Sequence, residues 1–184
     1  MSAITFVLGG ARSGKSAFAQ HLAFEIGGEA VLFIATLRET EAVRADPEMQ
    51  QRLARHRAVR PSAWRTLVLE DDLAVIARAL ETAPTRCVLL DCLSLYVSGA
   101  LFMSEVLPAD VEDRAAQLAE SLVMFARATA CPWVIVSNEV GMDVTPPSPA
   151  ARAYRDALGR ANQIVARHAD RAFLIVAGLP LRLK

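Results

Sequence analysis

Short apolar runs alternate with longer amphipathic segments along this chain. The runs are rich in branched residues and lack polar alternation, which is typical of strands buried on both faces of a parallel sheet. The expected strands are Ile4–Leu8, Ala30–Ala35, Val88–Asp91, Trp133–Ser137 and Ala172–Ala177. The expected helices lie between them, at Lys15–Ile26, Pro47–Ala58, Asp72–Glu81, Pro108–Thr129 and Pro149–His168. This alternation predicts a layered α/β fold.

Two further runs and one loop complete the predicted organisation. Arg65–Leu69 and Leu179–Lys184 are shorter and more mixed, and each is expected to add a strand. Asp143–Pro149 contains three prolines, which remove backbone donors and stop regular structure. With 184 residues, 53% of them apolar, the chain is long enough for one sizeable core. Residues 1–184 are therefore expected to form a single domain.

Composition excludes several classes of partner. Twenty basic residues balance twenty acidic ones and are scattered along the chain, so nucleic acid is not an expected partner. No apolar run approaches the roughly 18 residues of a membrane span, and the start MSAITFVLGG does not resemble a signal peptide. The three cysteines form no CxxC pair and are expected to be small buried residues. A cytoplasmic protein is predicted.

A glycine-rich segment directly after the first predicted strand matches G-x-x-x-x-G-K-[ST]. It consists of Gly9, Gly10, Ala11, Arg12, Ser13, Gly14, Lys15 and Ser16. Its glycines let backbone N–H groups and a helix N-terminus point at phosphate oxygens, while Lys15 reaches the β- and γ-phosphates and Ser16 holds Mg²⁺. A turn with an exposed lysine is the alternative, but it does not account for the flanking strand and helix. The segment predicts a three-layer P-loop NTPase (RecA-like) with a mostly parallel central sheet.

Asp91 ends an apolar run, as the aspartate that completes a magnesium site in P-loop enzymes does. This position predicts a place at the carboxyl edge of the sheet, near the glycine-rich segment. Asp91 could instead cap the next segment. The magnesium interpretation is favoured because it supplies the partner that Ser16 requires, so Ser16 and Asp91 are the predicted metal ligands. The chain has no Asn-Lys-x-Asp stretch, which disfavours a regulatory GTPase.

A second candidate lies on the predicted helix that follows Asp46-Pro47-Glu48, residues typical of a helix start. If the helix persists beyond Ala58, Arg52, His56 and Arg60 fall near one face, and Arg55 and Arg57 flank the histidine. Guanidinium groups in this arrangement could clamp a triphosphate that the imidazole attacks. The alternative is a basic, solvated helix face on which the histidine is incidental or a simple acid or base.

Several sequence blocks decide between these alternatives. They are GGARSGKS at 9–16, IAT at 34–36, RHRAVRPSAW at 55–64, LLDCLSLYV at 89–97, SNEVGM at 137–142, YRDALGRANQ at 154–163 and AGLPLRLK at 177–184. In these blocks, their order and their spacing, the chain resembles the bifunctional adenosylcobinamide kinase/adenosylcobinamide-phosphate guanylyltransferases of cobalamin biosynthesis, over nearly its whole length.

The resemblance implies two reactions at one nucleotide site. The γ-phosphoryl group of ATP or GTP passes to adenosylcobinamide, with Lys15 as a catalytic residue. A histidine, here His56, then attacks the α-phosphate of GTP and carries GMP until adenosylcobinamide-phosphate accepts it, which gives adenosyl-GDP-cobinamide. The implied cofactor is Mg²⁺, the implied co-substrates are ATP and GTP, and the implied assembly is a homotrimer.

The resemblance also implies nucleotide contacts outside the glycine-rich segment. They fall on Thr36, Leu37, Arg38, Arg57, Ala58, Val59, Arg60 and Asp91. The family commonly has a glutamate where this chain has Val68, with Glu70 two residues later as the candidate for that contact. It often has Asn where this chain has Gly99.

For three other residues the sequence allows two interpretations. Glu139 could act as a base or orient a substrate, or it could be an ion-paired loop residue. Arg155 and Asp156 could contact a phosphate or a subunit, or form an ordinary helix surface. His21 and His168 have no expected chemistry. Two alternatives to the bifunctional enzyme remain open, namely a small-molecule kinase without guanylyltransferase activity and a nucleotide-gated binding module.

Overall fold

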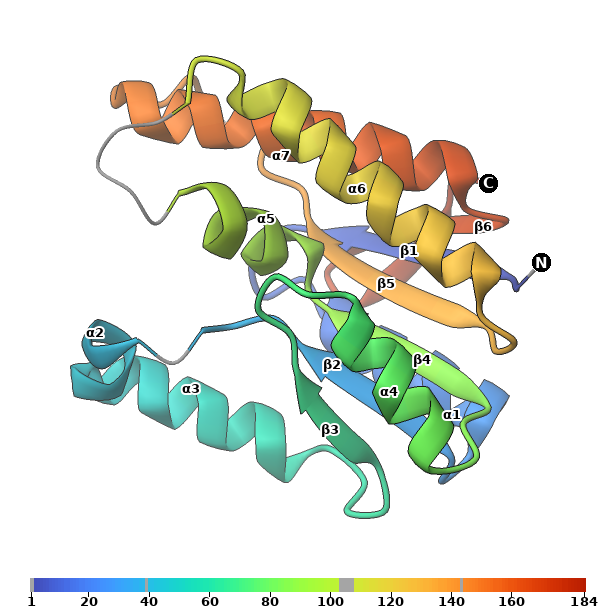
Figure 1. Cartoon of the computed structure of the whole chain (residues 1–184). Coiled ribbons are helices and arrows are strands. Elements are labelled where there is room, and N and C mark those ends of the chain that lie inside the picture. The colour runs from blue at the N-terminus through green and yellow to red at the C-terminus, as the bar shows by residue number, and fades with distance from the viewer. Residues whose placement is uncertain (1, 39, 103–107, 143) are drawn as a thin grey trace.

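A seven-stranded sheet forms the centre of the computed structural model, which describes residues 2–38, 40–102, 108–142 and 144–184 (Figure 1). The strands are β1 (Ile4–Gly9), β2 (Val31–Ala35), β3 (Arg65–Val68), β4 (Cys87–Asp91), β5 (Trp133–Asn138), β6 (Arg171–Val176) and β7 (Leu179–Arg182). Their order is β3-β2-β4-β5-β1-β6-β7, and every pair is parallel except the β6–β7 hairpin. The predicted α/β fold with a mostly parallel sheet is confirmed.

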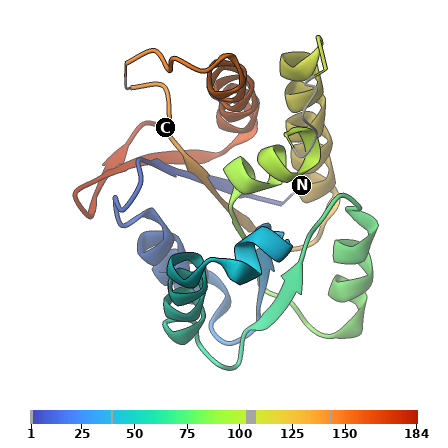
Figure 2. The same ribbon diagram turned by 90° about the vertical axis from the view of Figure 1, so that its left-hand side faces the viewer.

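The strand order brings three strand ends together. β5 lies between β1 and β4, so that Gly9 pairs with Asn138 and Asp91 pairs with Val136. Because parallel strands end at the same edge of a sheet, residues that follow β1, β4 and β5 gather at the carboxyl edge. Figure 2 looks onto the side of the molecule where α2, α3 and α5 lie.

Helices cover both faces of this sheet. They are α1 (Lys15–Gly27), α2 (Glu41–Ala45), α3 (Pro47–Ala58), α4 (Ala74–Thr82), α5 (Leu93–Leu101), α6 (Val111–Ala128) and α7 (Pro149–His168). α4, α5, α6 and α7 lie on one face and α1 on the other, which gives three layers (Figures 1 and 2). No helix in the described ranges is long and apolar enough to cross a membrane.

Alternate strand residues build a separate core on each face. Ile4 and Phe6 of β1 pack with the helices α4 to α7, whereas Val7 packs with α1 residues such as Ala19 and Ala23. All of these side chains are fully buried. This two-sided burial explains why the strands appear in the sequence as continuous apolar runs.

α3 differs from the other long helices because none of its described residues is buried. Its start is well defined, since the Asp46 carboxylate accepts hydrogen bonds from the N–H groups of Glu48 and Met49 at 2.9 and 3.1 Å, and Pro47 occupies the first turn. The cap therefore fixes where α3 begins, but no buried face anchors its described residues.

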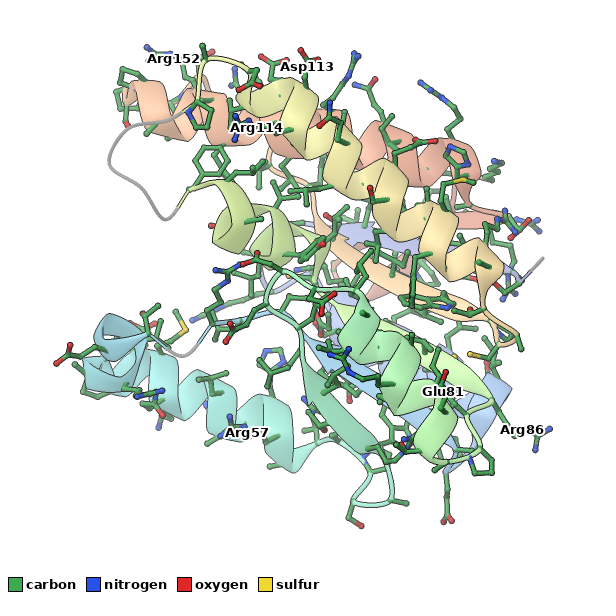
Figure 3. The ribbon with its side chains drawn as sticks, viewed as in Figure 1. Arg57, Glu81, Arg86, Asp113, Arg114 and Arg152 are labelled. Atoms are coloured by element: carbon green, nitrogen blue, oxygen red, sulfur yellow. The ribbon has the colours of Figure 1, made fainter. Side chains whose placement is uncertain are left out.

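Two elements are absent from the sequence prediction. α5 has a nearly continuous apolar sequence, LSLYVSGAL, in which helical periodicity is hard to recognise, and α2 spans only five residues. The other elements were predicted correctly, with ends that differ by a few residues. The proline-rich loop has no regular structure over residues 144–148, while Asp143 lies outside the described residues. Arg152 of α7 donates to the carbonyls of Pro146 and Pro147, which anchors this loop (Figure 3).

Candidate active site

Two adjoining cavities lie between α3 and the glycine-rich segment 9–16, hereafter the P-loop. The larger, of about 500 Å³, is lined by Arg12, Ser13, Gly14, Lys15, Ser16, Ala17, Glu48, Arg55 and His56. The smaller, of about 260 Å³, is lined by Lys15, Ser16, Phe33, Ala35, Leu37, Met49, Leu53, His56, Arg60, Asp91, Cys92, Leu95 and Asn138. Lys15, Ser16 and His56 line both cavities, so the start of α1 and one face of α3 border a shared cleft.

The P-loop backbone requires glycine at Gly14. This residue has a φ of 93°, and a side chain there would meet the Gly178 Cα at 3.1 Å. Gly178 lies in the turn between β6 and β7, and its N–H donates to the Ser13 carbonyl at 2.8 Å. The β6–β7 hairpin therefore contacts the P-loop and stabilises its backbone.

Lys15 is buried at the first position of α1, with only 8% of its surface exposed. Its Nζ donates to the Gly10 carbonyl at 3.1 Å, across the mouth of the P-loop. The ammonium group and the helix N-terminus together make this end of the cleft favourable for an anion.

Asp91 stands next to Ser16 at the end of β4. Burial raises the pKa of Asp91 above its ordinary value. A hydrogen bond from Ser16 acts in the opposite direction, as do the charges of the nearby basic side chains of His56, Lys15 and Arg60. A buried carboxylate beside a hydroxyl and several basic groups is suited to hold a cation that accompanies phosphates.

His56 lies on α3 two turns after its start region and is half-buried. Met49, Leu53 and His56 share one face of α3 and line the smaller cavity, together with Arg60 just after the end of the helix. Arg55 lines the larger cavity, whereas Arg57 lies on an exposed part of α3 (Figure 3). The imidazole thus faces the P-loop across the cleft.

Arg60 forms part of the wall of the smaller cavity. Its guanidinium lies 3.4 Å from the centre of the Phe33 ring, and its Nη1 donates to Thr66 Oγ1 at 2.7 Å. Burial lowers the pKa of Arg60 from its ordinary value; Asp91 opposes this shift and Arg57 adds to it. Its Nε is buried without a hydrogen-bond partner among the described residues.

Other predicted contact residues lie away from the cavities. The Thr36 side chain is 1% exposed, and its hydroxyl both accepts from the Cys92 N–H and donates to the Cys92 carbonyl, each at 2.7 Å. Arg38 is ion-paired with Asp71, and a Cβ on Gly99 would meet its Nε at 2.7 Å, so the glycine leaves room for this arginine. The remaining residues that line neither cavity are Gly9, Gly10, Ala11, Arg57, Ala58, Val59 and Glu70.

Several residues of the cavity walls were not predicted from the sequence. Leu53 and Met49 share the helix face of His56, and this spacing could have identified them. Cys92 directly follows β4 and Asn138 ends β5. Because ligands bind at the carboxyl ends of parallel strands, these positions could also have identified them. Phe33, Ala35 and Leu95 gave no signal beyond their apolar character.

The residues with two interpretations lie outside both cavities. Glu139 accepts a hydrogen bond from the Gly141 N–H at 2.7 Å, and Arg155 is ion-paired with Asp156 at 3.4 Å. His21 lies 3.4 Å from the Glu25 carboxylate and His168 lies 3.2 Å from that of Glu120. The His168–Glu120 contact joins α7 to α6, and the other three lie within one segment of the chain.

Comparison with known proteins gives a consistent result. Residues 5–183 match the sequence profile of the family described as cobinamide kinase / cobinamide phosphate guanyltransferase. The bifunctional adenosylcobalamin biosynthesis protein CobP of Pseudomonas aeruginosa is 41% identical over 97% of this chain and 95% of its own length. The corresponding protein CobU of Salmonella typhimurium is 37% identical, over 97% and 98%. A solved structure of an ATPase domain shares the fold, with a TM-score of 0.54 at 15% identity over 94% of this chain and 68% of that one.

Proposed function

The chain belongs to the cobinamide kinase / cobinamide phosphate guanyltransferase family, and from this premise we propose that one cleft carries out both reactions. The first reaction phosphorylates the aminopropanol hydroxyl of adenosylcobinamide with ATP or GTP. The second transfers GMP from GTP to adenosylcobinamide-phosphate. A kinase without the second activity is not favoured, since the similar curated proteins are named bifunctional.

The position of His56 supports this proposal most directly. It lines both cavities together with Lys15 and Ser16, so a triphosphate held by the P-loop would lie beside the imidazole. An incidental histidine on a solvated helix face would have no reason to share walls with the P-loop.

The kinase half would depend on the buried end of the cleft. Lys15 would contact the β- and γ-phosphates and stabilise the charge on the group in transfer. Ser16 and Asp91 fit Mg²⁺, because a hydroxyl and a carboxylate already joined by a hydrogen bond are oxygen ligands of the kind this ion prefers. When bound, the ion would neutralise phosphate charge.

The transferase half would use His56 as the nucleophile. A ring nitrogen attacks the α-phosphorus of GTP, the bond to the bridging oxygen breaks, and pyrophosphate leaves with the electron pair. GMP then remains on His56 as a phosphoramidate. A phosphate oxygen of adenosylcobinamide-phosphate attacks the same phosphorus, the N–P bond breaks, and adenosyl-GDP-cobinamide leaves with the imidazole restored.

The predicted nucleotide contacts fall into two groups under this proposal. Wall residues would touch the nucleotide directly, and they are Arg12, Ser13, Gly14, Lys15, Ser16, Leu37, Arg60 and Asp91. Gly9, Gly10 and Ala11 would act through the P-loop backbone. The others would need a different side-chain or loop arrangement to reach it, and they are Thr36, Arg38, Arg57, Ala58, Val59 and Glu70.

We further propose that residues 1–184 act as one catalytic domain, in the cytoplasm and as a homotrimer. The free, buried thiols of Cys87, Cys92 and Cys131 suit a reducing compartment. Exposed apolar side chains on the β6–β7 hairpin and just beyond it support a subunit interface: Val176, Leu179, Leu181 and Leu183 are 55–72% exposed. Nucleic acid is not proposed as a partner because the basic residues are balanced by acidic ones.

Labels on the α-phosphate and on the γ-phosphate of the nucleotide report separately on the transferase and kinase reactions. We expect His56→Ala to lose the acid-labile, base-stable label from α-labelled GTP while it still transfers label from γ-labelled ATP or GTP to adenosylcobinamide. Lys15→Ala should lower both reactions by about a hundredfold or more. His21→Ala is the matched control, because His21 is exposed on α1 and should leave both labels unchanged. A His56→Ala protein that still takes the α-label would refute the assignment.

A further inference from the structure

Asn138 lies between the P-loop and Asp91, the two parts of the proposed phosphate site. It ends β5, the strand that separates the P-loop strand β1 from β4, which carries Asp91. It pairs in register with Gly9, the first residue of the P-loop. Its half-buried side chain lines the smaller cavity with Lys15 and Asp91. The terminal phosphate of a nucleotide held between those two residues would lie in front of it.

The Asn138 side chain is oriented by α5. Its Nδ2 donates to Ser94 Oγ at 3.1 Å, and that fully buried hydroxyl also lies 2.8 Å from Cys92 Sγ. When Ser94 gives its single proton to the sulfur, its oxygen accepts the hydrogen bond from Asn138. One amide N–H of Asn138 then remains without a partner among the described residues, next to the cavity.

The Asn138 backbone is held independently by α7. The buried Asn162 side chain donates from Nδ2 to the Asn138 carbonyl at 3.1 Å and accepts from Ser137 Oγ at 2.7 Å. Both the strand end and the carboxamide are thus fixed before any ligand arrives. A donor fixed in this way costs little reorganisation when charge develops in front of it.

We infer that Asn138 is a catalytic residue of the kinase reaction, where its remaining amide N–H hydrogen-bonds the phosphoryl group in transfer. This inference rests on the proposed function. The acceptor hydroxyl oxygen bonds to the γ-phosphorus, the bond to the β–γ bridging oxygen breaks with its electron pair going to the nucleoside diphosphate, and the hydroxyl proton passes to solvent. Asn138 neither gains nor loses a proton. It stabilises the charge on the equatorial oxygens of the transferring group.

The two reactions should respond differently to a change at this position. The kinase step breaks a bond at the γ-phosphorus, whereas guanylylation of His56 breaks one at the α-phosphorus. We expect Asn138→Ala to lower the kcat of cobinamide phosphorylation by about a hundredfold. Its rate of labelling by α-labelled GTP should stay within about threefold of wild type. Asn138→Asp, which has the same shape but no amide donor and an added negative charge, should lose at least as much kinase activity.

Asn162→Ala is the matched control for packing, since it removes buried hydrogen bonds from the same strand end without removing a group from the cavity. We expect it to lower both rates by the same factor. The inference is overturned if Asn138→Asp phosphorylates cobinamide as fast as wild type, or if Asn162→Ala reproduces the selective kinase loss. If the wild-type protein phosphorylates no cobinamide, both the proposed function and this inference are wrong. If the wild-type protein is active but the Asn138 variants keep full kinase activity, only this inference is wrong and the proposed function stands.

Discussion

Thr36 lies at the carboxyl edge of the sheet, outside both cavities, and its side chain positions the backbone next to Asp91. Its hydroxyl closes two hydrogen bonds with the backbone of Cys92, the residue that directly follows Asp91. These bonds join the end of β2 to the end of β4. Thr36 therefore fixes the backbone that positions the carboxylate, although its family block suggested a nucleotide contact.

Replacement of Thr36 by valine tests this structural role. The change keeps the shape but leaves the buried Cys92 N–H unpaired, whereas the Cys92 carbonyl keeps its hydrogen bond from the Tyr96 N–H, so we expect a loss of about 2 kcal/mol in unfolding free energy. Urea unfolding of the nucleotide-free protein measures it. Thr145→Val in the exposed loop is the control and should change stability by less than about 0.5 kcal/mol. Equal stability of the two variants would contradict the proposed role.

At the scale of elements, α3 and the α6–α7 pair differ in how many of their residues are buried. α6 and α7 lie side by side and bury residues such as Leu122 and Leu158 (Figure 1). α3 has a capped start but no buried described residue, although it carries His56. Local stability follows buried apolar contacts, so the histidine lies on one of the least stable helices of the fold.

Hydrogen exchange should reveal this difference. We expect amides of α3 to exchange through local opening, well before those of α6 and α7, and to slow when GTP and Mg²⁺ are added. Mass spectrometry of peptides covering residues 47–58 and 111–128 makes the comparison within one sample. Similar protection of both peptides in the free protein would show that α3 is held by contacts other than those described.

The amino edge of the sheet is tied by a cluster around Asp170. This carboxylate accepts from the Ile4 N–H at 2.7 Å and is ion-paired with Arg127 of α6 at 2.9 Å. Partial burial disfavours its charge, but the hydrogen bonds from Arg127 and Ile4 and the charges of Arg127 and Lys184 outweigh burial and lower the pKa of Asp170. The cluster joins β1, α6 and the start of β6.

The lowered pKa of Asp170 makes its contribution depend on pH. An aspartate whose folded pKa lies below its ordinary value of about 3.9 stabilises the fold above that pH and loses the contribution as pH falls through the folded pKa. We expect Asp170→Asn to cost about 1 kcal/mol at pH 7, since the pair is partly exposed, and less at pH 3, where the carboxylate has begun to lose this contribution. Denaturant unfolding at both pH values measures this. Glu29→Gln, at an exposed position between α1 and β2, is the control and should change stability by less than about 0.5 kcal/mol at either pH.

At the scale of the whole molecule, the β7 edge of the sheet is exposed and apolar. β7 is the antiparallel edge strand, and all of its residues are exposed. Together with Val176 and Leu183, its leucines form an apolar stripe on a chain whose other strands are mostly buried. An exposed apolar edge is costly unless another molecule covers it.

We therefore expect the β6–β7 hairpin to form the subunit interface of the proposed trimer. Leu181→Lys should shift the sedimenting species to a lower mass without loss of helical content. Met124→Lys is the control, because Met124 of α6 is as exposed as Leu181, at 57% each, but lies outside the hairpin. A monomeric wild-type protein, or a Leu181→Lys protein of unchanged mass, would contradict this expectation.

The sequence predicted those parts of the site that depend on local order along the chain. The P-loop follows a buried strand, Asp91 ends another, and His56 lies on a helix with a clear start, so each could be placed from its neighbours. The walls formed by Phe33, Leu95 and Asn138 depend on strand order and on α5, which no local pattern shows. Nor does a local pattern show the ion pair between Arg38 and Asp71, because Asp71 lies in a loop far along the chain.

The proposed function requires the imidazole of His56 to reach the α-phosphate of GTP held by the P-loop. Peptide mapping by mass spectrometry, after incubation with GTP and Mg²⁺ and digestion under basic conditions that preserve a phosphoramidate, tests this directly. We expect one GMP adduct, on His56. An adduct on another residue, or none in a protein that still makes adenosyl-GDP-cobinamide, would contradict it.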